Sequence, residues 1–178
     1  MPRLTTPACA GQIQDVCDVQ VPQAPAEIEL KVAAAPEELA AYFDIRRAVF
    51  VTEQQIFEDT DVDGFDAVAI PILALADGRA AGAVRCYPKR PGEPCVWFGG
   101  RLAVAREHRT GCNIGALLVR KAVEVMQGRS DVTRFLATIQ IQNVRFFKRL
   151  GWTSLGKPFM MNARKHQVME KPLRRIAQ

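Results

Sequence analysis

Residues 98–128 read FGGRLAVAREHRTGCNIGALLVRKAVEVMQG, and this stretch decides the fold. From Trp97 to Val104 it is an apolar run of the kind that forms a strand. After residue 114, leucines, valines and Met126 recur at spacings that face one side of a helix, while charged residues take the other side. The stretch therefore predicts a strand and a helix joined by a turn.

The turn from Arg109 to Gly115 has the composition of an anion-binding turn. Its two glycines allow backbone geometries that aim several N–H groups at one point. The helix start adds unpaired N–H groups and the positive end of the helix dipole, and Asn113 is placed to cap it. Phosphate is the natural ligand. Neither a Rossmann fingerprint nor a P-loop fits, because there is no GxGxxG and no Lys-Ser or Lys-Thr after the second glycine.

The same stretch resembles the acetyl-CoA motif of the GNAT N-acetyltransferases, a strand ending in L-x-V followed by R-G-x-G-I-G and a leucine-rich helix. The match covers 102–104, Arg109 and 114–118. The turn is one residue longer than usual, and Asn113 stands where the family has its penultimate glycine. The resemblance implies acetyl-CoA as co-substrate. It places these residues at the cofactor: Leu102, Ala103, Val104, Arg109, Thr110, Gly111, Cys112, Asn113, Ile114, Gly115, Asn143 and Phe147.

A second region, IRRAVFVTEQQ at 45–55, resembles the R-x-x-V-F-V-x-E-Q block of the ElaA-like branch of the family. Glu53 in this block is the first candidate for the base that deprotonates an amine; the alternative is that it only holds the loop. An acidic loop follows, with five carboxylates between residues 58 and 66. It could attract a cationic amine or simply be solvated. Its spacing is not that of an EF-hand.

Two further segments carry the resemblance to the end of the chain. Residues 143–152, NVRFFKRLGW, resemble N-x-x-x-x-F-Y-x-x-x-G-F, but Phe147 stands where many members have a tyrosine as general acid. Residues 165–169, KHQVM, resemble a P-H-x-x-M ending and make His166 the second candidate base, with a structural role as the alternative. Tyr87 is a candidate acid or an ordinary strand-end aromatic. A narrower resemblance points to the GNAT subgroup linked with nitrilase gene clusters.

The family implies an α/β (α+β) fold: one GNAT-type domain with a mixed, mostly antiparallel sheet, splayed at its centre and flanked by helices. Pantetheine would lie between strands 100–104 and 135–139. The remaining helices, strands and loops are predicted from the hydrophobic periodicity and turn residues of the sequence. They are a strand at 27–33, a helix from Pro36, a hairpin of 67–76 and 80–87 about Asp77-Gly78, a loop at 88–94, a helix at 143–150 and a last strand at 165–169.

Length and composition restrict the number of domains and the classes of protein to which the chain can belong. A chain of 178 residues fits one domain, assigned to 27–173, with a proline-bearing extension at 1–26 and a tail at 174–178. No run of 18 apolar residues could span a membrane, and the N-terminus does not read as a secretory signal. Five scattered cysteines favour a reducing, cytoplasmic compartment, and Cys9 and Cys17 lack the companions of a metal site. The net charge of +5 is spread along the chain, with no nucleic-acid-binding motif.

These expectations define an acyltransferase that moves an acetyl group from acetyl-CoA to a primary amine of a small molecule or peptide by direct attack. Its partners are acetyl-CoA and an amine acceptor, without metal, membrane or nucleic acid; a homodimer stays open. A covalent route through Cys112 is disfavoured, because the phosphate turn lies far from the acyl end. Two alternatives remain: an acyl-homoserine-lactone-synthase-like enzyme and a non-catalytic acyl-CoA-binding module.

Overall fold

The computed structural model describes residues 26–90, 93–161 and 163–174. Most of the predicted N-terminal extension and C-terminal tail therefore lies outside the described residues. Four short helices, η1 (Ala48–Glu53), η2 (Asp66–Val68), η3 (Arg106–His108) and η4 (Ile141–Asn143), join the main elements. The main elements are β1 (Ile28–Val32), α1 (Pro36–Arg47), β2 (Ile70–Ala76), β3 (Arg79–Arg90), β4 (Glu93–Val104), α2 (Ile114–Gln127), β5 (Arg134–Gln140), α3 (Val144–Arg149), β6 (Thr153–Met161) and β7 (Arg164–Lys171).

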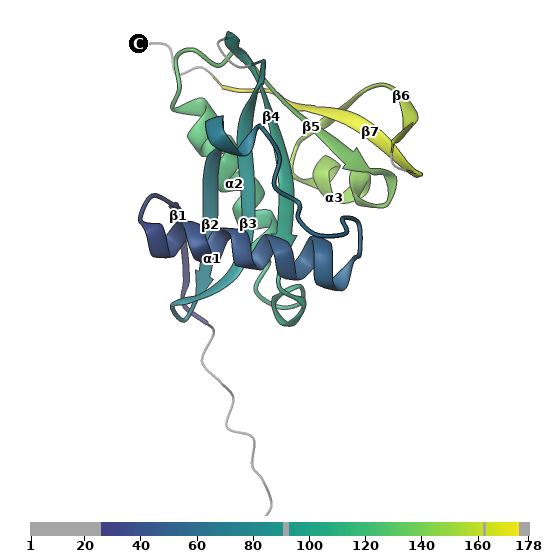
Figure 1. Ribbon diagram of the computed structural model, residues 1–178. Coiled ribbons are helices and arrows are strands. Elements are labelled where there is room, and N and C mark those ends of the chain that lie inside the picture. The colour runs from purple at the N-terminus through teal and green to yellow at the C-terminus, as the bar shows by residue number, and fades with distance from the viewer. Residues whose placement is uncertain (1–25, 91–92, 162, 175–178) are drawn as a thin grey trace, which may run out of the picture.

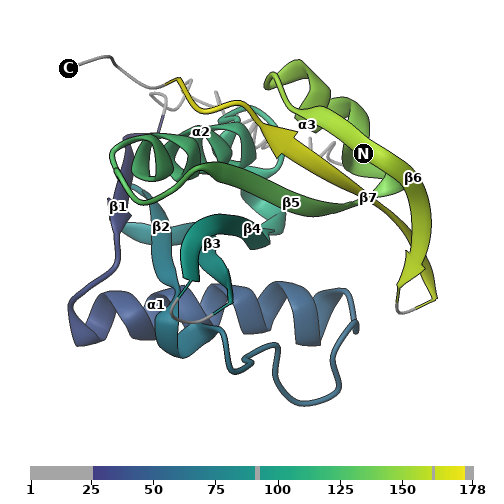
Figure 2. The ribbon, with the colours of Figure 1, turned by 90° about the horizontal axis from the view of Figure 1, so that it is seen from above.

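The strands form one sheet in the order β1-β2-β3-β4-β5-β7-β6. Only β4 and β5 run parallel; the other neighbours are antiparallel. Helix α1 crosses one face of the sheet, whereas α2 and α3 lie on the other (Figures 1 and 2). This arrangement confirms the predicted single α/β domain with a mixed, mostly antiparallel sheet and flanking helices.

Each face of the sheet is closed by the apolar side of a helix. Ile114, Leu118 and Met126 of α2 are fully buried in the larger core cluster, while Tyr42 and Ile45 of α1 belong to the smaller one. Burial of each such aliphatic side chain stabilises the fold by about 1.5–3 kcal/mol. At Gly82 a Cβ would lie 2.8 Å from Leu118 Cδ1, so the glycine is what lets α2 approach the sheet this closely.

The sheet opens between β4 and β5, as predicted. Among the described residues, Val96–Gly99 of β4 pair with Arg134–Ala137 of β5. The pairing stops at Gly99 and Ala137, although β4 continues to Val104 and β5 to Gln140. On its other edge β4 pairs with β3 through an irregularity that leaves Val84 facing both Arg101 and Leu102. Arg101 has a left-handed φ of 53°. Such a bulge bends the strand and disturbs its ladder, which turns the end of β4 away from β5.

One expectation about the chain path was wrong, and one strand was not predicted. Residues 88–94 are not simply a loop, because β3 continues to Arg90 and β4 begins at Glu93. Pro88 is accommodated next to an irregular register, where a missing N–H costs little. The edge strand β6 was not predicted, since most of its side chains are exposed and give no two-residue hydrophobic alternation.

The loop after α1 is fastened to the sheet by buried ion pairs. Arg46 is fully buried and donates to Asp61 Oδ2 at 2.7 Å and to Asp66 Oδ1 at 2.6 Å. Arg85 of β3 adds a bidentate pair with Asp63 at 2.6 and 2.8 Å. Three of the five acids of the acidic loop are therefore committed to arginines. The expectation of an acidic mouth for a cationic amine does not hold.

Replacing Asp66 by Asn is predicted to lower the free energy of unfolding by about 3–5 kcal/mol, because Arg46 would lose a buried partner. Burial pushes the pKa of Asp66 up, but hydrogen bonds from Arg46, the Asp63 N–H and Arg85 outweigh it and lower the pKa to about 2. A lowered pKa contributes stability above the unfolded value of 3.8 that is lost as pH falls toward 2. Urea unfolding at several pH values measures both effects.

Asp59→Asn, at an exposed position in the same loop, is the control. It should leave stability within about 0.5 kcal/mol of the native value. Equal, small losses in both variants would show that the Arg46 ion pairs do not hold the loop.

Candidate active site

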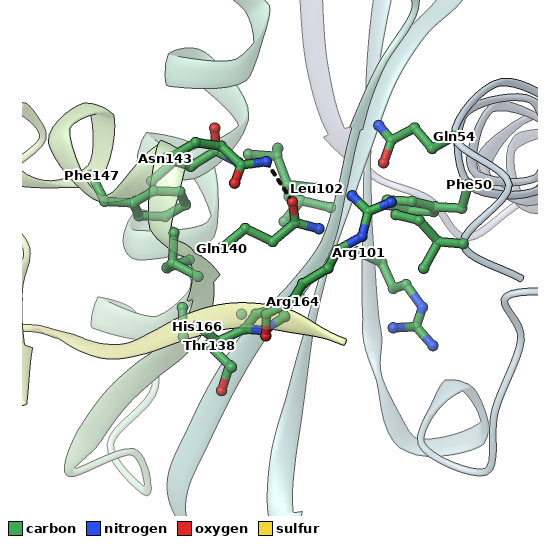
Figure 3. A pocket seen from close by; sticks show the side chains of 18 of the residues that line it. Phe50, Gln54, Arg101, Leu102, Thr138, Gln140, Asn143, Phe147, Arg164 and His166 are labelled. Carbon is green, nitrogen blue, oxygen red and sulfur yellow. Dashed lines mark hydrogen bonds between the residues drawn. The ribbon is translucent and has the colours of Figure 1, made fainter. Parts of the chain in front are cut away.

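The opening between β4 and β5 forms a cavity of about 660 Å³. Its walls come from both faces of the sheet, as Figure 3 shows. Phe50 and Gln54 stand on the α1 side, Asn143 and Phe147 on the α3 side. The strands contribute 99–102 of β4, 137–140 of β5, and Arg164 and His166 of β7. A ligand in this cavity would pass between two strands that no longer pair.

A second cavity of about 350 Å³ leads from this opening to the start of α2. It shares Leu102, Asn143 and Phe147 with the first cavity and adds Val104, Asn113 and Gly115, among others. The two cavities together give a path from the predicted phosphate turn to the middle of the sheet. A long ligand with an anionic end suits this shape.

The turn before α2 keeps its N–H groups available in an unexpected way. Asn113 does not cap the helix with its side chain; it takes a left-handed φ of 52° instead. Its carbonyl oxygen accepts from the N–H groups of Ala116 and Leu117, at 2.9 and 3.1 Å. The N–H groups of Ile114 and Gly115 are left at the positive end of the helix dipole, where anions bind.

Gly115 has no packing reason to be glycine. A Cβ built there would meet Val104 Cγ2 at 3.7 Å and Phe146 Cζ at 3.8 Å, which is ordinary contact. Glycine inside a helix costs about 1 kcal/mol relative to alanine. Since Gly115 lines the second cavity, the space above it suits close approach of a ligand to the backbone.

An ion pair connects the phosphate turn to the segment after α1. Glu53 accepts from both terminal nitrogens of Arg109 at 2.6 and 2.7 Å, and Arg109 Nε donates to the carbonyl oxygen of Val104 at 3.0 Å. The hydrogen bonds from Arg109 lower the pKa of Glu53. Glu53 is absent from the described lining of the cavities, whereas its neighbour Gln54 lines both. The Glu53 carboxylate is thus turned to Arg109.

His166 lies in the wall of the larger cavity with 6% of its surface exposed. Its Nδ1 is 2.9 Å from the carbonyl oxygen of Arg164. Because a carbonyl only accepts, Nδ1 carries the hydrogen in this contact, and in the neutral ring Nε2 is the nitrogen that can accept a proton. The arrangement leaves His166 able to act as a base.

Some of the other predicted site residues line the cavities, and others lie outside the described cavity walls. Phe147 lines both cavities and is packed edge-on to Phe146 and Trp152. Tyr87 packs against Phe65 and Phe98, and the Arg85 guanidinium lies over its ring. It is not among the described residues that line the larger cavity, and burial raises the pKa of its hydroxyl. Leu102 and Val104 line the cavities, but the following do not appear among the described lining residues: Ala103, Thr110, Gly111, Cys112 and Ile114.

Sequence reasoning missed several residues of the cavity. The π-helical turn η1 brings Phe50, and Gln54 directly after it, to the wall of the larger cavity, while Val49 lines the second cavity. Arg101 and Arg164 also line the cavity. Nothing in their local sequence marks them, because their positions depend on the bulge in β4 and on the pairing of β7. Insertion of a π turn is common at functional sites, but its position is not readable from periodicity.

Comparison with known proteins agrees with this geometry. The family model of the acetyltransferase (GNAT) family matches residues 36–152, more than half of the chain. The uncharacterized N-acetyltransferase YjcF of Bacillus subtilis is 25% identical over 134 residues, covering 74% of this chain and 90% of that protein. The narrower resemblance to the nitrilase-cluster subgroup stays a prediction.

Solved structures of other proteins share the fold, and two of them serve as examples. Escherichia coli ElaA superposes with a TM-score of 0.70 at 20% identity, covering 83% of this chain and 99% of that one. An acyl-CoA N-acyltransferase from Pseudomonas aeruginosa gives 0.69 at 22% identity with the same coverage.

Gly115→Ala is predicted to weaken acetyl-CoA binding at least about tenfold, a loss of about 1.4 kcal/mol, without harming the fold. The new methyl group would occupy the space above the helix start, while helix propensity would raise the free energy of unfolding by up to about 1 kcal/mol. Calorimetric titration and thermal unfolding measure the two effects. Gly128→Ala, at the other end of α2, is the matched control and should bind normally. Unchanged affinity in Gly115→Ala would remove the phosphate turn from the donor site.

Proposed function

Because the chain belongs to the GNAT family of acetyltransferases, we propose that it transfers an acetyl group from acetyl-CoA to a primary amine by direct attack in a ternary complex. The observation that carries the proposal is the open β4–β5 pair, with Gly115 at one end of the cavities and His166 in the wall of the larger one. A ligand that crosses this opening can receive an amine from the α1 side.

The phosphates of acetyl-CoA would bind at the start of α2, on the N–H groups of Ile114 and Gly115, with Arg109 nearby. Pantetheine would follow β4, whose backbone groups beyond Gly99 lack partners on β5. An extended ligand can pair with such an edge as an added strand does. Binding in this way depends on the backbone more than on side chains, which is consistent with Ala103 facing away from the cavities.

His166 would take the proton from the acceptor nitrogen as that nitrogen attacks the thioester carbonyl. The nitrogen–carbon bond forms, the carbon–sulfur bond breaks, and the thiolate leaves with its electron pair. Phe147 has no proton to give, so the thiolate takes one from solvent or from the His166 imidazolium. Main-chain N–H groups of β4 near the Arg101 bulge would polarise the carbonyl oxygen in this scheme.

Glu53 has a different task in this scheme. Its carboxylate fixes Arg109, and through it the phosphate turn, to the segment that walls the acceptor side. It would therefore affect binding of acetyl-CoA more than proton transfer.

Replacing His166 by Gln is predicted to lower kcat by about 100-fold or more while leaving the Kd of acetyl-CoA unchanged, because only the base is removed. Glu53→Gln should instead raise that Kd several-fold and keep most of kcat. Thiol release from acetyl-CoA in the presence of an amine panel measures kcat, and calorimetry measures Kd.

The reverse pattern, with kcat lost in Glu53→Gln and kept in His166→Gln, would exchange the two roles. Binding of acetyl-CoA without thiol release for any amine would contradict transfer altogether and leave a non-catalytic acyl-CoA-binding module.

A further inference from the structure

The ionisable side chains on the described surface of the larger cavity are all basic. Its ionisable lining residues are Arg101, Arg109, Arg164 and His166, and no carboxylate lines it among the residues that the structure describes. A second cation entering such a site would be repelled. The cavity therefore disfavours acceptors that carry additional positive charge and favours those that carry an anion.

Two of the three guanidinium groups already have acidic partners. Arg101 pairs with Asp61 and Asp63 at 3.3 and 3.1 Å and lies over the Phe57 ring at 4.6 Å. Arg109 is held by Glu53. Among the residues that the structure describes, the Arg164 side chain makes no hydrogen bond or ion pair. The contact of Arg164 with His166 Nδ1 uses its main-chain carbonyl oxygen. Arg164 is thus the cavity arginine left to bind a ligand.

The position of Arg164 suits the acceptor rather than the donor. In Figure 3 its side chain extends from β7 across the cavity toward Phe50 and Gln54, away from Asn143 and Phe147 on the donor side. The guanidinium fork matches a carboxylate with two parallel hydrogen bonds. The apolar side chains of Phe50 and Met161 line the same cavity and leave room beside the guanidinium for an apolar part of the ligand.

Arg164 and His166 also stand at a useful spacing. Side chains two residues apart on a strand point to the same face, about 7 Å apart along it. A ligand whose carboxylate meets Arg164 could therefore bring an amine a few bonds away to His166. Amino acids have this arrangement.

We propose that the acceptor is an amine that also bears a carboxylate, of the amino acid class with an apolar side chain, and that Arg164 binds its carboxylate. This inference rests on the proposed acetyl transfer. Arg164 then determines acceptor specificity, while the wall of Phe50, Phe57 and Met161 contacts the apolar side chain.

The test uses the full chain, acetyl-CoA and matched acceptors: leucine, methionine and phenylalanine, each beside its carboxamide. The amino acids should exceed their carboxamides in kcat/KM by about 100-fold, the loss expected when a charged bidentate contact is removed. Arg164→Gln should remove this preference through KM for the amino acid and leave KM for acetyl-CoA unchanged. Arg164→Lys should restore part of it, because the charge returns without the fork.

Lys165→Gln is the control for loss of one positive charge, since residue 165 faces the opposite side of β7. It should retain the native preference. Equal or better turnover of the carboxamides would overturn the carboxylate inference while acetyl transfer stands. A rise in KM for acetyl-CoA in Arg164→Gln would instead assign Arg164 to the donor. If acetyl-CoA bound but no amine released thiol, acetyl transfer and this inference would both fail.

Discussion

The parallel pairing of β4 with β5 ends at Gly99 and Ala137, and the site depends on this early end. Backbone N–H and C=O groups that are shielded from bulk water need partners. Beyond Gly99, the backbone groups of β4 that face β3 have partners there, whereas those that face β5 have none on that strand. A ligand laid along that edge completes the sheet. The bulge at Arg101 keeps the two strands from closing on each other.

The walls of the opening are held by charge. On the acceptor side, Arg46 and Arg85 bind the acids of the loop that follows α1. Ion pairs of this kind add little net stability over apolar packing, but breaking one leaves an unpaired buried charge. They are better understood as fixing one loop position. Glu53 and Arg109 do the same between the acceptor wall and the phosphate turn.

Most of the fold could be predicted from local sequence. The strand at 97–104, the glycine turn and the helix after it carry specific sequence patterns, and they mark the half of the site that we propose for the donor. Strand β6 was not predicted because its side chains are mostly exposed. The end of β3 at Arg90 and the start of β4 at Glu93 were not predicted because prolines suggested a loop. Asn113 was placed correctly, but it uses its backbone rather than its side chain to begin the helix.

The acceptor half was far less predictable, because its residues meet only through tertiary structure. The acids at 58–66 suggested an attraction for cations. Three of them, Asp61, Asp63 and Asp66, instead form ion pairs with arginines of α1, β3 and β4. Glu53 stays a predicted base, but its partner Arg109 lies 56 residues away and could not be read from local sequence. Arg164 has no local signal at all. Its significance lies in lining a cavity without the acidic partners that Arg101 and Arg109 have, as far as the described residues show.

The most direct test of the account is amide hydrogen exchange of the protein with and without acetyl-CoA. If the open edge of β4 receives the donor, amides in residues 100–104 and at 114–115 should become strongly protected on binding, while those of β1 and β2 stay as they were. Binding of acetyl-CoA with no change of exchange in β4 would contradict the claim that the ligand completes the sheet at this opening.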